Sequence, residues 1–124
     1  MKFGVVGYGS IGQRHIRNLF ALGYKDIILL RKISSGNDYD LKEFTKMQAF
    51  LDARPDAVII ANPTKMHAEY IAQILPLNIH ILVEKPLVAN IEELQLLQDQ
   101  LINYTGIGMT AYNMHFHPCV RFAK

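Results

Sequence analysis

The sequence predicts an α/β fold class, a doubly wound parallel sheet with helices on both faces. Short runs rich in Val and Ile alternate with segments whose apolar residues recur at helical spacing, which is the pattern of parallel strands joined by helices. The runs are apolar at consecutive positions, as expected of strands that are buried on both faces. With 124 residues, half of them apolar, the chain is long enough for one domain with its own core and too apolar to be disordered.

Five apolar runs are predicted to be strands. The last of them contains glycine, which weakens a strand. The five runs are Phe3–Val6, Ile27–Leu30, Ala57–Ala61, Ile79–Val83 and Ile107–Tyr112. Residues 39–44 are interpreted as a short edge strand, with an extra helical turn as the alternative.

Helices are predicted between these strands. The helix after the first strand carries Ile16, Leu19 and Phe20 on one side, and Gly23 can end it. Another helix covers residues 64–75, and Pro76 follows it.

Two predicted helices begin with a capping box, in which two side chains each bond a backbone N–H at the helix start. Thr45 with Gln48 forms one such pair, and Pro55 ends the segment that follows. Asn90 with Glu93 forms the other. Its helix carries an apolar stripe of Ile91, Leu94, Leu97 and Leu101.

Charge and composition exclude several classes of function. Thirteen Lys and Arg against eleven Asp and Glu give a net charge of +2, too balanced for a nucleic-acid or membrane-surface binder. Cys119 is the single cysteine and cannot form an internal disulfide, which makes a reducing, intracellular setting the default. No apolar run approaches the ~20 residues that a membrane helix needs. We therefore expect a cytoplasmic protein with no nucleic-acid or membrane partner.

Residues 7–12 match the dinucleotide-binding fingerprint G-x-G-x-x-G, after a predicted strand and at the start of a predicted helix, which is the context that the fingerprint requires. Gly7 is expected to permit the tight turn, Gly9 to let the backbone approach a pyrophosphate, and Gly12 to let helix and strand pack closely. The helix N-terminus would offer its N–H groups to the phosphates. The alternative is a turn that binds nothing. The predicted cofactor contacts are Gly7, Tyr8, Gly9, Ser10, Ile11 and Gly12.

Basic residues stand at the end of the second predicted strand, where NAD-binding chains carry an acid for the ribose 2′-hydroxyl. The residues here are Arg31 and Lys32, and the next carboxylate is Asp38. Arginine can hold a 2′-phosphate and stack on adenine. We therefore predict that NADP is favoured over NAD, the alternative being a solvated arginine at a strand end.

Polar residues also follow two later strands at their carboxyl ends, where ligands bind in doubly wound sheets. Asn62 and Pro63 follow the strand at residues 57–61, and His67 lies one turn into the next helix. Thr64 is expected to cap that helix, which explains most of this segment without a ligand. The alternative for His67 is a partly exposed helix histidine.

Glu84, Lys85 and Pro86 follow the strand at residues 79–83. A lysine at this edge can lose solvation and serve in acid–base chemistry, although a solvated surface lysine is the alternative. Pro86 can carry a cis peptide bond. His115 and His117 have no accompanying Cys or carboxylate cluster, whereas a structural zinc takes four ligands, so no metal site is predicted.

Together these motifs resemble the N-terminal domain of the glucose–fructose oxidoreductase / inositol dehydrogenase (Gfo/Idh/MocA) family. The Glu84-Lys85-Pro86 element is the most specific part of the resemblance, which spans nearly the whole chain. It implies a Rossmann-type dinucleotide-binding domain of a nicotinamide-dependent oxidoreductase that acts on a sugar, cyclitol or related hydroxyl or carbonyl compound. The matching segments are residues 7–12 with Arg14, His15 and Leu19, residues 55–63 with His67, residues 83–87, and residues 112–113 with 116–118.

The resemblance also assigns roles. The family's lysine, matched by Lys85, lies beside the nicotinamide and assists proton transfer. Residues matching Asn62, Pro63, His67, Glu84 and Asn113 line the cofactor and substrate edge. Family members commonly have arginine where His115 stands, which places any role of His115 in doubt.

Family chains continue into a substrate-binding sheet domain. The resemblance therefore implies that residues 1–124 form the dinucleotide-binding domain, with residues 112–124 as the start of the crossover, in a full-length form that we expect to be a homo-oligomer. A stand-alone, non-enzymatic dinucleotide sensor is the alternative. A methyltransferase is disfavoured, because methyl transfer has no need of Lys85.

Overall fold

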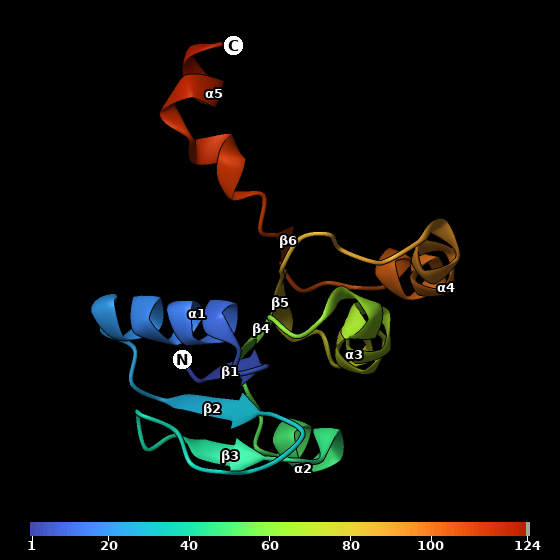
Figure 1. Ribbon diagram of the computed structural model, residues 1–124. Helices are drawn as coiled ribbons and strands as arrows, with labels where there is room; N and C mark the ends of the chain where they lie inside the picture. The colour runs from blue at the N-terminus through green and yellow to red at the C-terminus, as the bar shows by residue number, and fades with distance from the viewer. Residues whose placement is uncertain (124) are drawn as a thin grey trace.

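A single six-stranded sheet forms the centre of the computed structural model, which describes residues 1–123 (Figure 1). All neighbouring strands are parallel, in the order β3-β2-β1-β4-β5-β6. The predicted doubly wound α/β fold is confirmed. The strands are β1 (Phe3–Val6), β2 (Ile27–Leu30), β3 (Lys42–Phe44), β4 (Ala57–Ile60), β5 (His80–Val83) and β6 (Gly108–Thr110).

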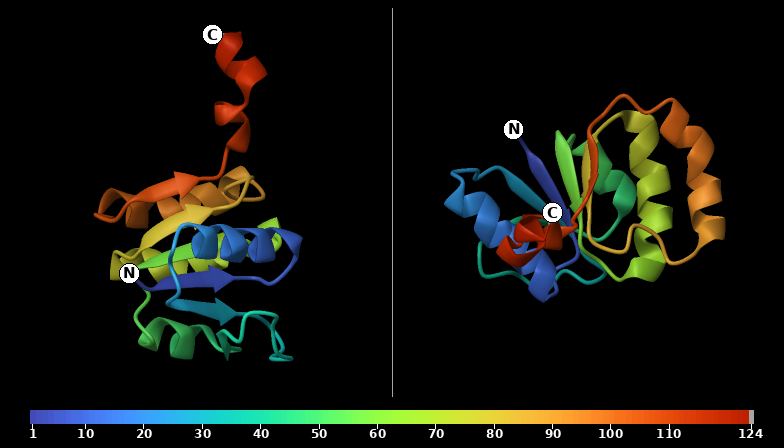
Figure 2. Two further views of the ribbon diagram at one scale, coloured as in Figure 1. Left: turned by 90° about the vertical axis from the view of Figure 1, so that its left-hand side faces the viewer. Right: turned by 90° about the horizontal axis from the view of Figure 1, so that it is seen from above.

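Helices cover both faces of the sheet (Figure 2). Helix α1 (Ser10–Ala21) packs on one face, and α2 (Met47–Asp52), α3 (His67–Ile74) and α4 (Ile91–Ile102) pack on the other. Strand order reverses between β1 and β4, and doubly wound folds bind ligands at the carboxyl ends of the strands beside such a switch point. Three 3₁₀ turns and one short helix complete the described elements, namely η1 (Thr64–Met66), η2 (Leu75–Leu77), η3 (Asn113–Phe116) and α5 (Pro118–Phe122).

Alternate residues of the central strands feed two cores. Val5 packs with Ile16 of α1, whereas Val6, one position on, joins the cluster around Phe50 on the opposite face. This alternation follows from the two-residue period of a strand. Strand β2 is buried along its whole length, and β1 and β4 are buried at all but their first residue, as predicted for central parallel strands.

Two of the predicted helix ends are confirmed. Gly23 has φ +89° and closes α1, because its N–H bonds Phe20 and the N–H of Tyr24 bonds Leu19, the pattern of a Schellman cap. The Asn90 side chain accepts the N–H of Glu93 at 2.9 Å, and the Glu93 carboxylate in turn accepts the N–H of Ala89 at 2.8 Å.

Two predicted caps are wrong. Thr45 does not cap α2, since the backbone stays extended through Lys46 and Gln48 donates to Asp52 instead. Thr64 does not cap α3 either, because the chain first makes the 3₁₀ turn η1 and the helix begins only at His67.

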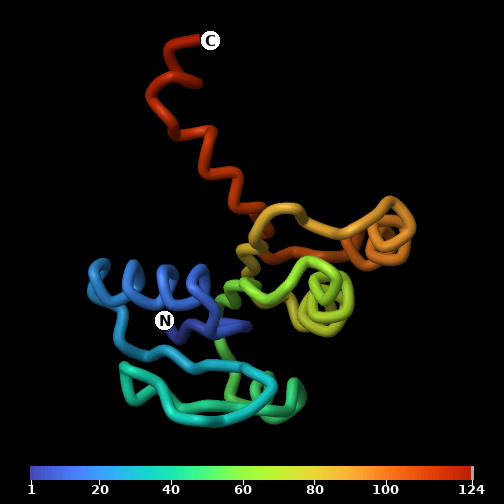
Figure 3. The backbone as a smooth tube through the Cα atoms, viewed as in Figure 1, coloured from blue at the N-terminus to red at the C-terminus, as the bar shows by residue number. Residues whose placement is uncertain are grey.

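The segment after β6 projects away from the body of the domain (Figure 3). Its apolar side chains Tyr112, Met114, Phe116 and Phe122 are exposed. No helix within residues 1–123 combines the length and the apolar character needed to cross a membrane.

Candidate dinucleotide-binding site

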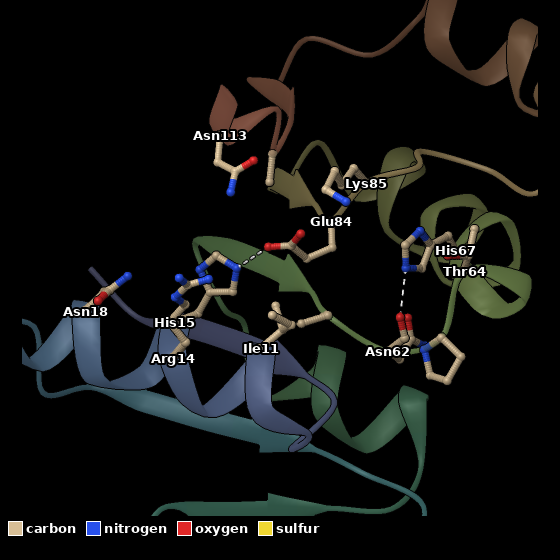
Figure 4. Close-up of a pocket in the computed structure, with 13 residues that line it drawn as sticks. Ile11, Arg14, His15, Asn18, Asn62, Thr64, His67, Glu84, Lys85 and Asn113 are labelled. Atoms are coloured by element: carbon tan, nitrogen blue, oxygen red, sulfur yellow. Dashed lines mark hydrogen bonds and ion pairs between the residues drawn. The ribbon is translucent and has the colours of Figure 1, made fainter. Parts of the chain in front are cut away.

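A cavity of about 550 Å³ lies at the carboxyl ends of the strands, between α1 and the segments that follow β4, β5 and β6 (Figure 4). It therefore occupies the place that the topology reserves for a ligand. From α1 it is lined by Ile11, Arg14, His15 and Asn18; from the later segments by Ala61, Asn62, Pro63, Thr64, His67, Glu84, Lys85, Ala111 and Asn113.

The glycine turn between β1 and α1 meets three different demands. Gly7 has φ +98°, and a Cβ there would lie 2.9 Å from the carbonyl oxygen of Ala61. A Cβ on Gly12 would overlap the carbonyl oxygen of Gly7. Gly9 has an ordinary φ of −72°, and a Cβ there would meet no atom within 4 Å. The fold thus explains the glycines at positions 7 and 12, whereas Gly9 leaves open space that the chain does not fill.

That open space adjoins the N-terminus of α1. Gly9 is the N-cap of this helix, no side chain caps it, and its first turn contains no acidic residue. A helix start of this kind presents backbone N–H groups and the positive end of the helix dipole. Ser10 and Ile11 of the predicted site are both exposed in this first turn.

On the far side of the glycine turn, Tyr8 contacts the end of β2. Its hydroxyl bonds the backbone N–H and the carboxylate of Asp38, at 3.1 and 3.3 Å. The guanidinium carbon of Arg31 lies 5.1 Å from the centre of the Tyr8 ring, within the range of a cation–π contact. Lys32, beside it, is exposed.

Arg31 also has an acidic neighbour. Its Nη1 donates to the carbonyl oxygen of Gly36 at 3.1 Å and to Glu43 Oε1 at 3.4 Å. Hydrogen bonds from Asn37, and after it Ser34, lower the pKa of Glu43, so this side chain is a carboxylate at neutral pH. Glu43 was not predicted as a neighbour of Arg31. The pairing of β3 with β2, rather than closeness in the sequence, brings the two residues together.

The side-chain amide of Asn62 is buried without a hydrogen-bond partner within residues 1–123. This is true of both its polar atoms, the oxygen and the nitrogen. A buried amide without a partner costs about 1–3 kcal/mol, so its presence at the wall of the cavity points to a partner that the chain does not supply.

His67 connects the turns after β4 and β5. Its side chain is 1% exposed. Nδ1 lies 2.9 Å from the carbonyl oxygen of Pro86, and Nε2 lies 2.9 Å from that of Asn62 (Figure 4). The Lys85–Pro86 peptide, in the turn after β5, is cis. A backbone carbonyl oxygen therefore lies against each ring nitrogen of His67.

Glu84 and Lys85 stand at the cavity rim, and Asn113 of η3 faces them (Figure 4). Lys85 is exposed and makes no ion pair with any described carboxylate. Glu84 Oε1 lies 2.7 Å from His15 Nε2. The cavity thus brings together the predicted residues at the ends of β4 and β5 with Asn113, whereas Arg31 and Lys32 at the end of β2 do not line it.

Arg14, His15 and Asn18 were not predicted to line a site, although Arg14 and His15 are part of the family resemblance. They lie at helical spacing after Ile11 and form one face of α1. A polar stripe at positions i+3, i+4 and i+7 beyond the glycine motif is the signal that would have revealed them. No three His, Cys, Asp or Glu side chains come together as a metal site in the described part of the chain.

The residues present fit a dinucleotide in three respects. Space beside Gly9 adjoins an uncapped helix start suited to a pyrophosphate. An aromatic ring and a guanidinium lie on the β2 side, where an adenosine would be held. An unpartnered amide lies on the β4 side.

Comparisons with known proteins also indicate a dinucleotide-binding domain. A family model described as an oxidoreductase family with an NAD-binding Rossmann fold matches residues 1–110. Glucose-6-phosphate 3-dehydrogenase of Bacillus subtilis is 30% identical over 129 residues, covering 99% of this chain and 37% of that protein. D-xylose 1-dehydrogenase [NADP(+)] of Haloarcula marismortui is 38% identical over 69 residues, covering 56% of this chain and 19% of that protein.

Among solved structures, scyllo-inositol dehydrogenase from Lactobacillus casei with bound NAD(H) and scyllo-inositol matches with a TM-score of 0.83 at 22% identity. The match covers 99% of this chain and 39% of that one, and it shows a shared fold. The chain thus spans less than half the length of these proteins.

Proposed function

Because the chain belongs to the Gfo/Idh/MocA oxidoreductase family, we propose that it is the cofactor-binding domain of a longer nicotinamide-dependent dehydrogenase. Its substrate would be a sugar, a cyclitol or a related compound with a reactive hydroxyl or carbonyl group. The named relatives, which act on glucose 6-phosphate and D-xylose, support this class. Residues 1–124 would form the dinucleotide domain, and residues 112–124 would lead to a second domain that supplies the substrate contacts.

The open space beside Gly9 carries the proposal. Gly9 has a backbone conformation that any residue adopts and no neighbour that a side chain would strike. Neither folding nor packing explains a glycine at this position. A ligand that approaches the backbone closely does explain it, and the adjoining helix start selects an anionic group such as a pyrophosphate.

Replacement of Gly9 by valine should therefore separate binding from folding. The free energy of unfolding should change by less than about 1 kcal/mol, because the added Cβ would meet no atom within 4 Å. Dinucleotide affinity should fall by about 5- to 150-fold, the equivalent of the ~1–3 kcal/mol that overpacking costs. Urea denaturation and calorimetric titration of the same variant measure the two effects. Unchanged affinity for the dinucleotide would argue that no pyrophosphate lies beside Gly9.

The side chains at the cavity rim supply the proposed chemistry. When bound, the nicotinamide ring accepts or donates the hydride. For oxidation of an alcohol, Lys85 in its neutral form would take the hydroxyl proton at Nζ while the adjacent carbon loses the hydride. The side-chain amide of Asn62, which has no partner within residues 1–123, would bond the nicotinamide side of the cofactor. Glu84, Pro63, His67 and Asn113 would complete this edge.

NADP remains our proposed preference over NAD. Arg31 is held against the Tyr8 ring, and Lys32 is exposed beside it. The related D-xylose 1-dehydrogenase carries NADP(+) in its name. Glu43 already neutralises part of the Arg31 charge. A 2′-phosphate would therefore add to an existing pair or take its place.

The Arg31→Ala variant tests this preference. A charge-assisted hydrogen bond contributes ~1.5–3 kcal/mol, so NADPH affinity should fall by roughly 10- to 150-fold while NADH affinity changes little. Arg121→Ala, at an exposed position on α5, is the matched control and should alter neither affinity. Equal affinities of the wild-type chain for NADPH and NADH would contradict the preference.

The cellular location and the partners that we propose for the longer protein are those that the sequence predicts. The single cysteine supports a reducing, cytoplasmic setting, and the nearly balanced charge supports the absence of nucleic-acid and membrane-surface partners. We also propose that the full-length form is a homo-oligomer.

A further inference from the structure

We infer that His15 is a positioning residue that holds the Glu84 carboxylate for the ribose hydroxyls on the nicotinamide side of the cofactor. This inference rests on the proposed function. It concerns a side chain on α1 that neither the glycine motif nor the Glu84-Lys85-Pro86 element contains.

The His15–Glu84 contact crosses the cavity. Nε2 of His15 lies 2.7 Å from Oε1 of Glu84, although 69 residues separate the two in the sequence. The side chains are only 16% and 23% exposed, so water competes weakly for the bond. Figure 4 shows the contact reaching from α1 to the end of β5, above the strand end that leads to Asn62.

His15 is the only described side chain that bonds the Glu84 carboxylate. Two cations, Arg14 and Lys85, line the same cavity, and neither forms an ion pair with Glu84. The histidine therefore draws Glu84 toward α1 and leaves the neighbouring Lys85 unpaired. The second oxygen of Glu84, Oε2, has no partner within residues 1–123.

The position of Glu84 indicates the ligand group that this oxygen takes. Arg31 lies at the end of β2 and Glu84 at the end of β5, on opposite sides of the glycine turn. A dinucleotide whose pyrophosphate lies at that turn places adenosine toward Arg31 and the nicotinamide ribose toward Glu84. A carboxylate oxygen accepts hydroxyl hydrogen bonds, and those to charged groups are the stronger ones. The geometry therefore matches a ribose diol.

Two ligands separate this role from a merely structural one. NADPH and ADP share the adenosine and pyrophosphate. NADPH adds the nicotinamide ribose and also a 2′-phosphate, which would lie on the Arg31 side of the glycine turn, away from His15. Calorimetric titration of the 124-residue chain should show NADPH affinity about tenfold weaker in His15→Ala, with ADP affinity within about twofold of wild type. His15→Gln should recover most of the NADPH affinity, because its amide N–H can still donate to Glu84.

Controls make each outcome decisive. Arg17→Ala, at an exposed position on the same helix, should leave both affinities unchanged. Glu84→Gln, which nearly preserves side-chain shape, should show the same selective loss as His15→Ala and replaces it if that variant does not fold. Equal loss of NADPH and ADP, no loss of NADPH, or no recovery in His15→Gln would overturn the role of His15 while the proposed function stands. A wild-type chain that binds neither ligand would overturn the proposed function itself.

Discussion

Replacement of Lys85 by alanine in the longer enzyme is expected to lower kcat by ~10²–10⁴, the scale of a lost acid–base group. Cofactor affinity should stay within about threefold of wild type, because the glycine turn, the start of α1 and Arg31 lie elsewhere in the site. The structure places Lys85 at the cavity rim, exposed and without an ion-pair partner among the described carboxylates. Steady-state kinetics together with cofactor titration measures both effects.

Lys65→Ala is the matched control for Lys85, since Lys65 is exposed on η1 and does not line the cavity. It should leave kcat unchanged. An unaltered kcat in Lys85→Ala would show that Lys85 takes no part in the chemistry. We expect no measurable turnover from the 124-residue chain alone, because positioning of the substrate contributes ~7–11 kcal/mol to lowering the barrier and would come from the second domain.

Replacement of Phe50 by alanine is expected to lower the free energy of unfolding by ~3–5 kcal/mol. Phe50 is 0% exposed. Its ring fills the space over Gly4 of β1 and meets Phe44 edge-on, with 6.1 Å between ring centres. Alanine would leave a cavity between α2 and the sheet. Urea denaturation of the 124-residue chain measures the loss.

Phe122→Ala is the matched control for Phe50. The Phe122 side chain is 94% exposed on α5, so its removal should change the free energy of unfolding by less than about 0.5 kcal/mol. A loss below about 1 kcal/mol in Phe50→Ala would contradict the packing of α2 against β1.

Elements with two independent sequence signals were predicted correctly. The strand at residues 3–6 and the helix after it are marked by apolar periodicity. They are marked also by the glycines between them, which form the tight turn from strand to helix. Asn90 and Glu93 mark the start of a helix whose apolar stripe begins at Ile91, and the structure confirms the two capping hydrogen bonds. Agreement between local and longer-range signals is what makes a segment predictable.

Predictions that rested on a local pattern alone were less secure. Thr45 and Gln48 have capping-box spacing, but β3 extends to Phe44 and the backbone at Lys46 remains extended. Pairing with β2 therefore decides where α2 begins. The caps at Thr45 and Thr64 fail because the preceding segment determines where the first helical turn can start.

Contacts across the site could not be predicted from sequence at all. Glu43 reaches Arg31 through the pairing of β3 with β2, and His15 reaches Glu84 across β4. Both pairs depend on strand order, which the glycine motif and the apolar runs do not specify. The unpartnered Asn62 amide likewise becomes visible only when burial and hydrogen bonds are known.

Titration of the 124-residue chain with NADPH, NADH and S-adenosylmethionine tests the central claim, that the cavity between α1 and the strand ends binds a nicotinamide dinucleotide. The account predicts weak but saturable binding of NADPH, weaker binding of NADH, and no saturable binding of S-adenosylmethionine. Absence of saturable binding for both nicotinamide dinucleotides, or tighter binding of S-adenosylmethionine than of either, would contradict it.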